Sequence, residues 1–259
     1  MNLGLEGKRA MLCASTRGLG FACAASLHRE GVEVWINGRS EATLRDAKAA
    51  LEAEGPAPVH AVLGDLNTEE GREALLNACP EPDILVTNNN GPAPGVYPQW
   101  GQAEWEGAFL ANMIAPALLI RAVVDGMRAR KFGRIVNITS AMVKTPHPNM
   151  GLSTAARAAL TAFAKGLSKE VAQDNVTINN LLPERFDTQR QQQMAKIAME
   201  MRGLSLEEAR AEMAATIAAK RLGRPEEFGD TCAFLCSAQA GYLSGQNLQL
   251  DGGSYPGLI

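Results

Sequence analysis

This 259-residue sequence is poor in aromatic residues and has only three tyrosines. Neither sign of charge is in large excess, since the net charge is −3. Its Lys and Arg residues are interspersed with Asp and Glu and form no basic block. Nucleic acids and anionic membranes are bound through concentrated positive charge, so neither is an expected partner. The hydrophobic fraction of 46% fits a soluble globular protein.

Long apolar runs are also lacking. The N-terminal sequence MNLGLEGKRAMLCAS has neither the apolar stretch nor the cleavage site of a signal peptide. No segment approaches the roughly 18 uninterrupted apolar residues of a membrane span. We therefore expect a cytoplasmic protein.

Cysteines are few and odd in number, which favours buried reduced thiols over a disulfide framework. They are Cys13, Cys23, Cys79, Cys232 and Cys236. Cys232 and Cys236 would share one face of a helix, but no further ligands are spaced nearby, so we expect no metal site.

Strand-like and helix-like segments alternate along the whole chain. The strand-like ranges are 8–14, 32–37, 58–64, 83–87, 134–139, 176–182 and 247–250. The helix-like ranges are 21–30, 41–54 and 153–172, with a further helix after Pro225. This alternation predicts an α/β fold with a doubly wound parallel sheet, covered by helices on both faces.

A polar insertion, residues 189–220, follows the sixth predicted strand and is rich in Gln, Met, Ala and Glu. It is interpreted either as a solvated amphipathic helix pair or as a mobile lid over a substrate site. No linker, composition break or repeat divides the chain, so residues 1–259 are expected to form a single domain.

The first strand runs into a glycine-containing turn and then a helix. Such a turn lets backbone N–H groups and the helix N-terminus approach a pyrophosphate closely, as in the Rossmann fold. The residues predicted to bind a dinucleotide here are Ala14, Ser15, Arg17, Gly18, Leu19 and Gly20.

At this point the chain resembles the short-chain dehydrogenase/reductase family, whose fingerprint here is Thr-Gly-x-x-x-Gly-x-Gly. Further segments resemble the family in the same order and cover essentially the whole chain. They are Asp65-Leu66, Asn88-Asn89-Asn90-Gly91, Asn112, Ser140, Arg221 to Glu227, and Leu250-Asp251-Gly252-Gly253. The resemblance is closest to the 3-oxoacyl-carrier-protein-reductase-like branch.

The resemblance implies further cofactor contacts from Asp65, Leu66, Asn89, Asn90, Gly91, Pro183 and Thr188. Two positions depart from the family pattern. Ala14 replaces the first glycine of the fingerprint, which is costly if the turn needs a positive φ. Glu184 replaces the glycine that usually follows Pro183.

Cofactor choice is read at the end of the second predicted strand, in Asn37-Gly38-Arg39-Ser40. An acidic residue there would bind the ribose 2′-hydroxyl of NAD, and none is present. Arg39 and Arg17 could flank a 2′-phosphate, or they could be solvated surface residues. We favour NADP(H).

In the family, Tyr donates the proton, Lys lowers its pKa and holds the nicotinamide ribose, Ser polarises the carbonyl, and Asn supports a water relay. Asn112 and Ser140 match the last two roles, while Ser153 and Arg157 stand at the Tyr and Lys positions. An aliphatic hydroxyl is a much weaker acid than a phenol. Arg157 can still bind a ribose and supply charge, but it does not titrate near neutrality.

Another side chain near Ser140 could donate the proton in place of the missing tyrosine. His147, seven residues past Ser140, is either that donor or a plain surface residue. Tyr97, in the Pro-rich loop 91–99, could reach inward or simply cover the base of the loop.

Two functions follow. The first is an NADP(H)-dependent oxidoreductase that transfers hydride to or from a small or acyl-type carbonyl or alcohol. The second is a catalytically inactive nucleotide-binding sensor or oligomeric protein, which the missing Tyr and Lys favour. The helices around Asn112 and Ser153 resemble the family's subunit contacts, so a homotetramer or homodimer is expected.

Overall fold

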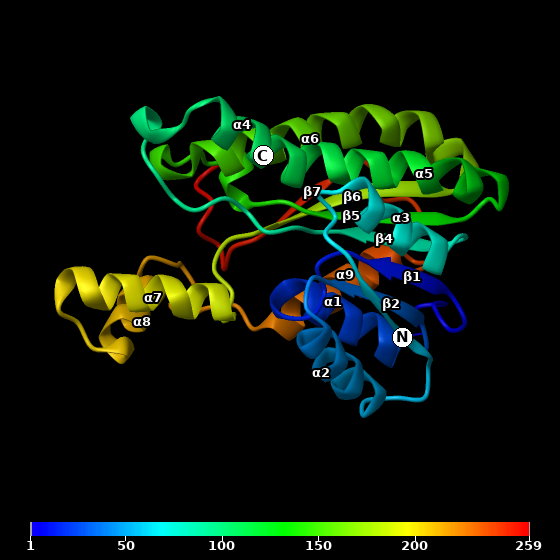
Figure 1. Ribbon diagram of the computed structural model, residues 1–259, viewed down its shortest axis with the longest axis horizontal. Coiled ribbons are helices and arrows are strands. Elements are labelled where there is room, and N and C mark those ends of the chain that lie inside the picture. The colour runs from blue at the N-terminus through cyan, green and yellow to red at the C-terminus, as the bar shows by residue number, and fades with distance from the viewer. Residues whose placement is uncertain (1, 259) are drawn as a thin grey trace.

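The computed structural model describes residues 2–258 and contains a seven-stranded parallel sheet in the order β3-β2-β1-β4-β5-β6-β7 (Figure 1). The strands are β1 (Arg9–Leu12), β2 (Glu33–Gly38), β3 (Val59–Leu63), β4 (Ile84–Thr87), β5 (Gly133–Ile138), β6 (Val176–Pro183) and β7 (Asn247–Leu250). The predicted doubly wound sheet is confirmed, and its strands lie within the predicted ranges to within a residue.

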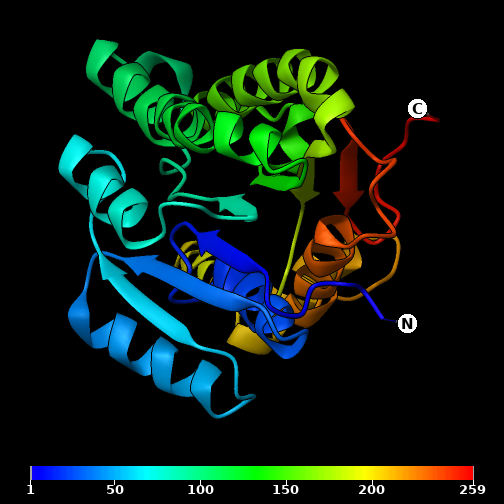
Figure 2. The ribbon, with the colours of Figure 1, turned by 90° about the vertical axis from the view of Figure 1, so that its right-hand side faces the viewer.

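Helices cover both faces of the sheet, as Figures 1 and 2 show. One layer holds α1 (Gly18–Arg29), α2 (Glu41–Glu52) and α9 (Pro225–Cys236), and the other holds α3 (Glu69–Ala78), α5 (Ala115–Ala129) and α6 (Gly151–Val171). Every residue of β4 and β5 is buried. Burial on both faces explains why these strands are apolar runs rather than alternating patterns.

A chain of polar side chains crosses the otherwise apolar strands. Thr87 Oγ1 donates to Asn137 Oδ1 at 2.6 Å, and Asn137 Nδ2 donates to Asn180 Oδ1 at 2.9 Å. Asn180 Nδ2 then donates to Asn247 Oδ1 at 2.8 Å. Buried amides are costly unless they are paired, so this chain fixes the relative positions of β4, β5, β6 and β7.

The helical run 102–129 is continuous and consists of α4 (Gln102–Phe109), a π-helical turn (Leu110–Ile114) and α5. By length and composition alone it could cross a membrane, although half of its most apolar window is buried inside the protein. The helical run 102–129 is not an uninterrupted apolar segment, because it contains Asn112 and Arg121. Its packing against α6 and β5 is that of a core helix.

Residues 189–220 form α7 (Gln189–Arg202) and α8 (Leu206–Ala215), a pair that projects from the body of the molecule in Figure 1. Gly203 ends α7 in the left-handed conformation, at φ +68°. Both carboxylate oxygens of Asp187 accept from Arg210, at 2.9 and 2.6 Å. This bidentate pair ties α8 to the segment that follows β6.

Candidate functional site

A cleft of about 1180 Å³ opens where the carboxyl ends of the parallel strands meet. This is where doubly wound folds bind ligands, because the strand order reverses between β1 and β4. The predicted site residues that line it are Ala14, Arg17, Gly18, Leu19, Arg39, Asp65, Leu66, Asn89, Asn90, Gly91, Ser140, His147, Ser153, Arg157, Pro183 and Thr188. Ser15, Gly20 and Asn112 lie outside this lining.

The turn after β1 is held by Asn37 and Asn88, which lie in two of the motifs above but were not predicted to contact Ala14. Ala14 has a positive φ of +43°, so the alanine occupies a conformation that favours glycine. Its N–H donates to Asn37 Oδ1 at 3.3 Å, and its carbonyl accepts from Asn88 Nδ2 at 3.1 Å. These bonds fix the strained residue in place.

Ser15 and Gly20 serve the packing of this turn. The buried Ser15 hydroxyl donates to the Leu12 carbonyl at 2.9 Å and accepts from the Asn37 N–H at 3.0 Å. A Cβ atom on Gly20 would lie 2.5 Å from the Ala14 carbonyl oxygen. Only glycine therefore lets α1 approach the turn so closely.

The N-terminus of α1 faces the cleft and offers uncapped amides. Arg17 is its N-cap residue and provides no side-chain cap, while Gly18 has φ +61°. The first N–H groups of a helix need partners, so this end suits a phosphate. The observed cradle fits a dinucleotide.

Two exposed arginines line the cleft. Arg39, just after β2, lies 3.7 Å from the Asp65 carboxylate, and Arg17 Nη1 donates to Gln189 Oε1 at 3.3 Å. No acidic residue occupies the carboxyl end of β2, which ends in Asn37 and Gly38. The arrangement suits a 2′-phosphate better than a bare ribose hydroxyl.

Arg157 is buried and anchored at the other end of the cleft. Its Nη1 donates to the carbonyls of Ile138 and Thr139 at 2.7 and 3.1 Å, and its Nε donates to Ser153 Oγ at 3.2 Å. Burial, with a further contribution from the nearby charge of Arg190, lowers the pKa of Arg157 to about 10. The guanidinium is therefore still a cation at neutral pH.

Two hydroxyl groups accompany this cation. Ser140 Oγ accepts from the Met142 N–H at 3.2 Å, and Ser153 Oγ accepts from Arg157. Because each oxygen already accepts a hydrogen bond, each hydroxyl hydrogen can be donated to a ligand oxygen in the cleft.

The structure brings His147 to the rim of the cleft and leaves Tyr97 away from it. His147 is exposed, and its Nδ1 accepts from the Asn149 N–H at 3.3 Å. The neutral ring then carries its hydrogen on Nε2. Tyr97 is 77% exposed and outside the linings of both cavities, so it does not reach inward to the site.

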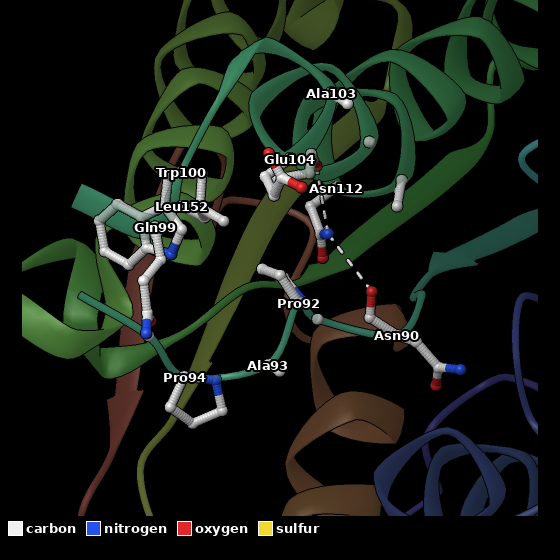
Figure 3. A pocket seen from close by; sticks show the side chains of 15 residues that line it. Asn90, Pro92, Ala93, Pro94, Gln99, Trp100, Ala103, Glu104, Asn112 and Leu152 are labelled. Atoms are coloured by element: carbon white, nitrogen blue, oxygen red, sulfur yellow. Dashed lines mark hydrogen bonds between the residues drawn. The ribbon is translucent and has the colours of Figure 1, made fainter. Parts of the chain in front are cut away.

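Asn112 lines a second cavity of about 370 Å³, which the loop 90–95 borders (Figure 3). Its Nδ2 donates to the carbonyls of Ala108 and Asn90, at 3.3 and 3.4 Å. Its Oδ1 is buried without a protein partner in residues 2–258. The π-helical turn sets this side chain beneath the loop.

No group of three or more His, Cys, Asp or Glu side chains that could hold a metal occurs within residues 2–258. The five cysteines are all buried. Both findings concern only the part of the chain that the structure describes.

Comparisons with known proteins identify the family of the chain. A family model described as "Enoyl-(Acyl carrier protein) reductase" matches residues 13–255. The chain is 33% identical over 258 residues to the uncharacterized oxidoreductase YvaG of Bacillus subtilis, with 98% of each chain covered. It is 32% identical to dehydrogenase/reductase SDR family member 4 of Bos taurus, over 96% of this chain and 88% of the relative.

Among solved structures, L-sorbose reductase from Gluconobacter frateurii, in complex with NADPH and L-sorbose, matches with a TM-score of 0.95. The two chains are 28% identical and fully cover one another. The chain therefore belongs to the short-chain dehydrogenase/reductase family.

Proposed function

We propose that this protein is an NADP(H)-dependent oxidoreductase that transfers hydride to or from a small or acyl-type carbonyl or alcohol, through a site in which Ser153 and Arg157 replace the family's Tyr and Lys. One observation carries the proposal. A buried guanidinium is fixed beside the Ser153 hydroxyl, and the Ser140 hydroxyl lines the same cleft.

The cofactor assignment follows from the relatives and the residues of the cleft. NADPH is bound in the L-sorbose reductase structure, and the 29% identical BacG of Bacillus subtilis is an NADPH-dependent reductase. Arg17 and Arg39 would hold the 2′-phosphate, and the turn at Gly18 would hold the pyrophosphate. When bound, the cofactor supplies the hydride.

The chain's own residues would stabilise charge on the substrate. Ser140 and Ser153 donate hydrogen bonds to the carbonyl oxygen, and Arg157 strengthens the Ser153 donor through its Nε contact. Negative charge that develops on this oxygen is then met by fixed donors and one cation in a partly water-excluded site. The proton comes from water or from His147 at the rim.

The helix pair α7–α8 is proposed as a lid, because residues from both helices, among them Met194 and Met213, line the cleft. The single-domain organisation, the cytoplasmic location and the homotetramer or homodimer stay predictions of the sequence.

NADPH oxidation in the presence of a panel of aldehydes, ketones and oxo esters tests this function. Ser140→Ala should lower kcat/KM by about 100-fold or more, as the loss of one oxyanion donor does. Unchanged turnover in this variant would count against the assigned chemistry. NADPH binding without any turnover would favour the nucleotide sensor instead.

A further inference from the structure

Two guanidinium groups converge beside Gly91 at the reaction end of the cleft. A Cβ atom placed on Gly91 would lie 3.5 Å from Nη2 of Arg157 and 3.9 Å from Nη2 of Arg190. The same point is 3.7 Å from Oγ of Ser153. Two positive charges and one hydroxyl therefore border a space that a glycine leaves without a side chain.

Neither guanidinium forms an ion pair in residues 2–258. The hydrogen bonds of Arg157 use its Nε and Nη1, which leaves the Nη2 of this buried side chain for a ligand. Arg190 Nη2 makes one long hydrogen bond of 3.5 Å, to the Pro92 carbonyl. By contrast, Arg185 lies 4.0 Å from the Glu184 carboxylate.

Two like charges without a counter-ion raise the free energy of this end of the cleft. Burial and the neighbouring Arg190 both lower the pKa of Arg157, yet both groups stay charged at neutral pH. An anion between them would relieve the repulsion and satisfy the open N–H groups. A planar carboxylate matches the geometry of guanidinium donors.

Arg190 contacts a different segment from the turn that would hold the cofactor phosphates. That turn meets the start of α7 one or two residues earlier, through the Arg17–Gln189 hydrogen bond of 3.3 Å and the proximity of Gly18 to Thr188. Arg190 instead reaches the loop 91–95, which borders the reaction site.

We propose that Arg157 and Arg190 together bind a carboxylate of the substrate, so that the protein acts on oxo acids or hydroxy acids in preference to neutral ketones and alcohols. This inference rests on the proposed function, because it assigns one end of the substrate in the same cleft.

The test is calorimetric, so it does not depend on turnover. NADPH and NADP+ are titrated first, and the NADP+ complex is then titrated with 2-oxobutanoate, acetoacetate and their methyl esters. The acids should bind about 10- to 100-fold more tightly than the esters, as expected for hydrogen bonds to a charged group. Arg190→Met should abolish this preference, and Arg190→Lys should retain part of it.

Lys196→Met is the matched control, since it removes one positive charge from an exposed position of the same helix. It should keep the full preference, and all variants should bind NADPH equally. Acids and esters that bind equally, or that both fail to bind, would overturn the inference while NADPH binding upholds the cofactor site. Weaker NADPH binding by Arg190→Met would also overturn it, because Arg190 would then serve the cofactor. Failure of the unaltered protein to bind NADPH would overturn the proposed function, and this inference with it.

Discussion

The Nε of Arg157 donates a hydrogen bond of 3.2 Å to the Oγ of Ser153, so the two residues that we propose replace the family's Lys and Tyr are each other's partners. They lie one turn apart on α6, and the guanidinium also reaches the carbonyls of Ile138 and Thr139 at the end of β5. The cation is thereby clamped between a helix and a strand.

This arrangement changes what the site can do with a proton. The family's tyrosine can donate its proton because a neighbouring cation lowers the pKa of a phenol. The Ser153 hydroxyl, even beside Arg157, remains a hydrogen-bond donor rather than an acid. We therefore expect the site to stabilise an oxyanion and to take the proton from outside the Ser153–Arg157 pair.

Ala14 is the residue at which the sequence carries backbone strain. Its φ of +43° favours glycine, so Ala14→Gly should stabilise the fold by about 0.5 to 1 kcal/mol in urea unfolding. The control is Ala53→Gly, at an exposed position with right-handed φ −76°, which should destabilise the fold by about the same amount. Destabilisation by both substitutions would show that the Asn37 and Asn88 contacts remove the strain.

Arg39 should set the preference for the phosphorylated cofactor. Arg39→Ala is expected to raise the Kd for NADPH by about 10- to 100-fold and to leave the Kd for NADH unchanged, because the lost hydrogen bonds are to the 2′-phosphate. Calorimetry at fixed salt measures both constants. Arg45→Ala, which removes an exposed charge from α2, is the control. Equal weakening of the two nucleotides would contradict this role.

Glu184 should make stability depend on pH. Burial raises the pKa of this carboxyl, Arg185 opposes the shift, and Asp251 adds to it. Because the folded-state pKa lies above the unfolded value, the protonated form stabilises the fold at low pH, and this contribution is lost as the pH rises through the folded-state pKa. Glu184→Gln should therefore have a higher Tm than the unaltered protein at pH 8.

The difference in Tm between the two proteins should disappear near pH 4, where Glu184 is protonated and therefore neutral like the glutamine that replaces it. Scanning calorimetry at both pH values measures it, with the exposed Glu200→Gln on α7 as the control. A difference that is the same at pH 4 and pH 8 would assign the effect to packing instead of to charge.

The sequence predicted the sheet well because each strand is an apolar run bounded by a turn, as in β4 and β5. Most of the site residues that it predicted line the cleft, because the family's motifs fall at the strand ends. Whether Ala14 is costly in the first turn depended on its φ, which the sequence does not give and which is +43° in the structure.

Other features depend on contacts between distant segments, which local patterns do not encode. Asn88 and Asn37 meet Ala14 from two other strand ends, and Arg190 reaches the loop 91–95 from a Gln-rich helix that matches no motif. The π-helical turn at Asn112 was likewise not predicted, because the run 102–129 has an ordinary apolar helical pattern.

The most direct test of the account compares NADPH oxidation by the unaltered protein, by Ser153→Ala and by the double variant Ser153→Tyr with Arg157→Lys. We expect the unaltered protein to reduce at least one carbonyl compound, and Ser153→Ala to lower kcat by about 100-fold without a change in the Kd for NADPH. If the unaltered protein binds NADPH and reduces none of the panel, while the double variant gains activity, the Ser153–Arg157 pair belongs to a binding protein and the account is wrong.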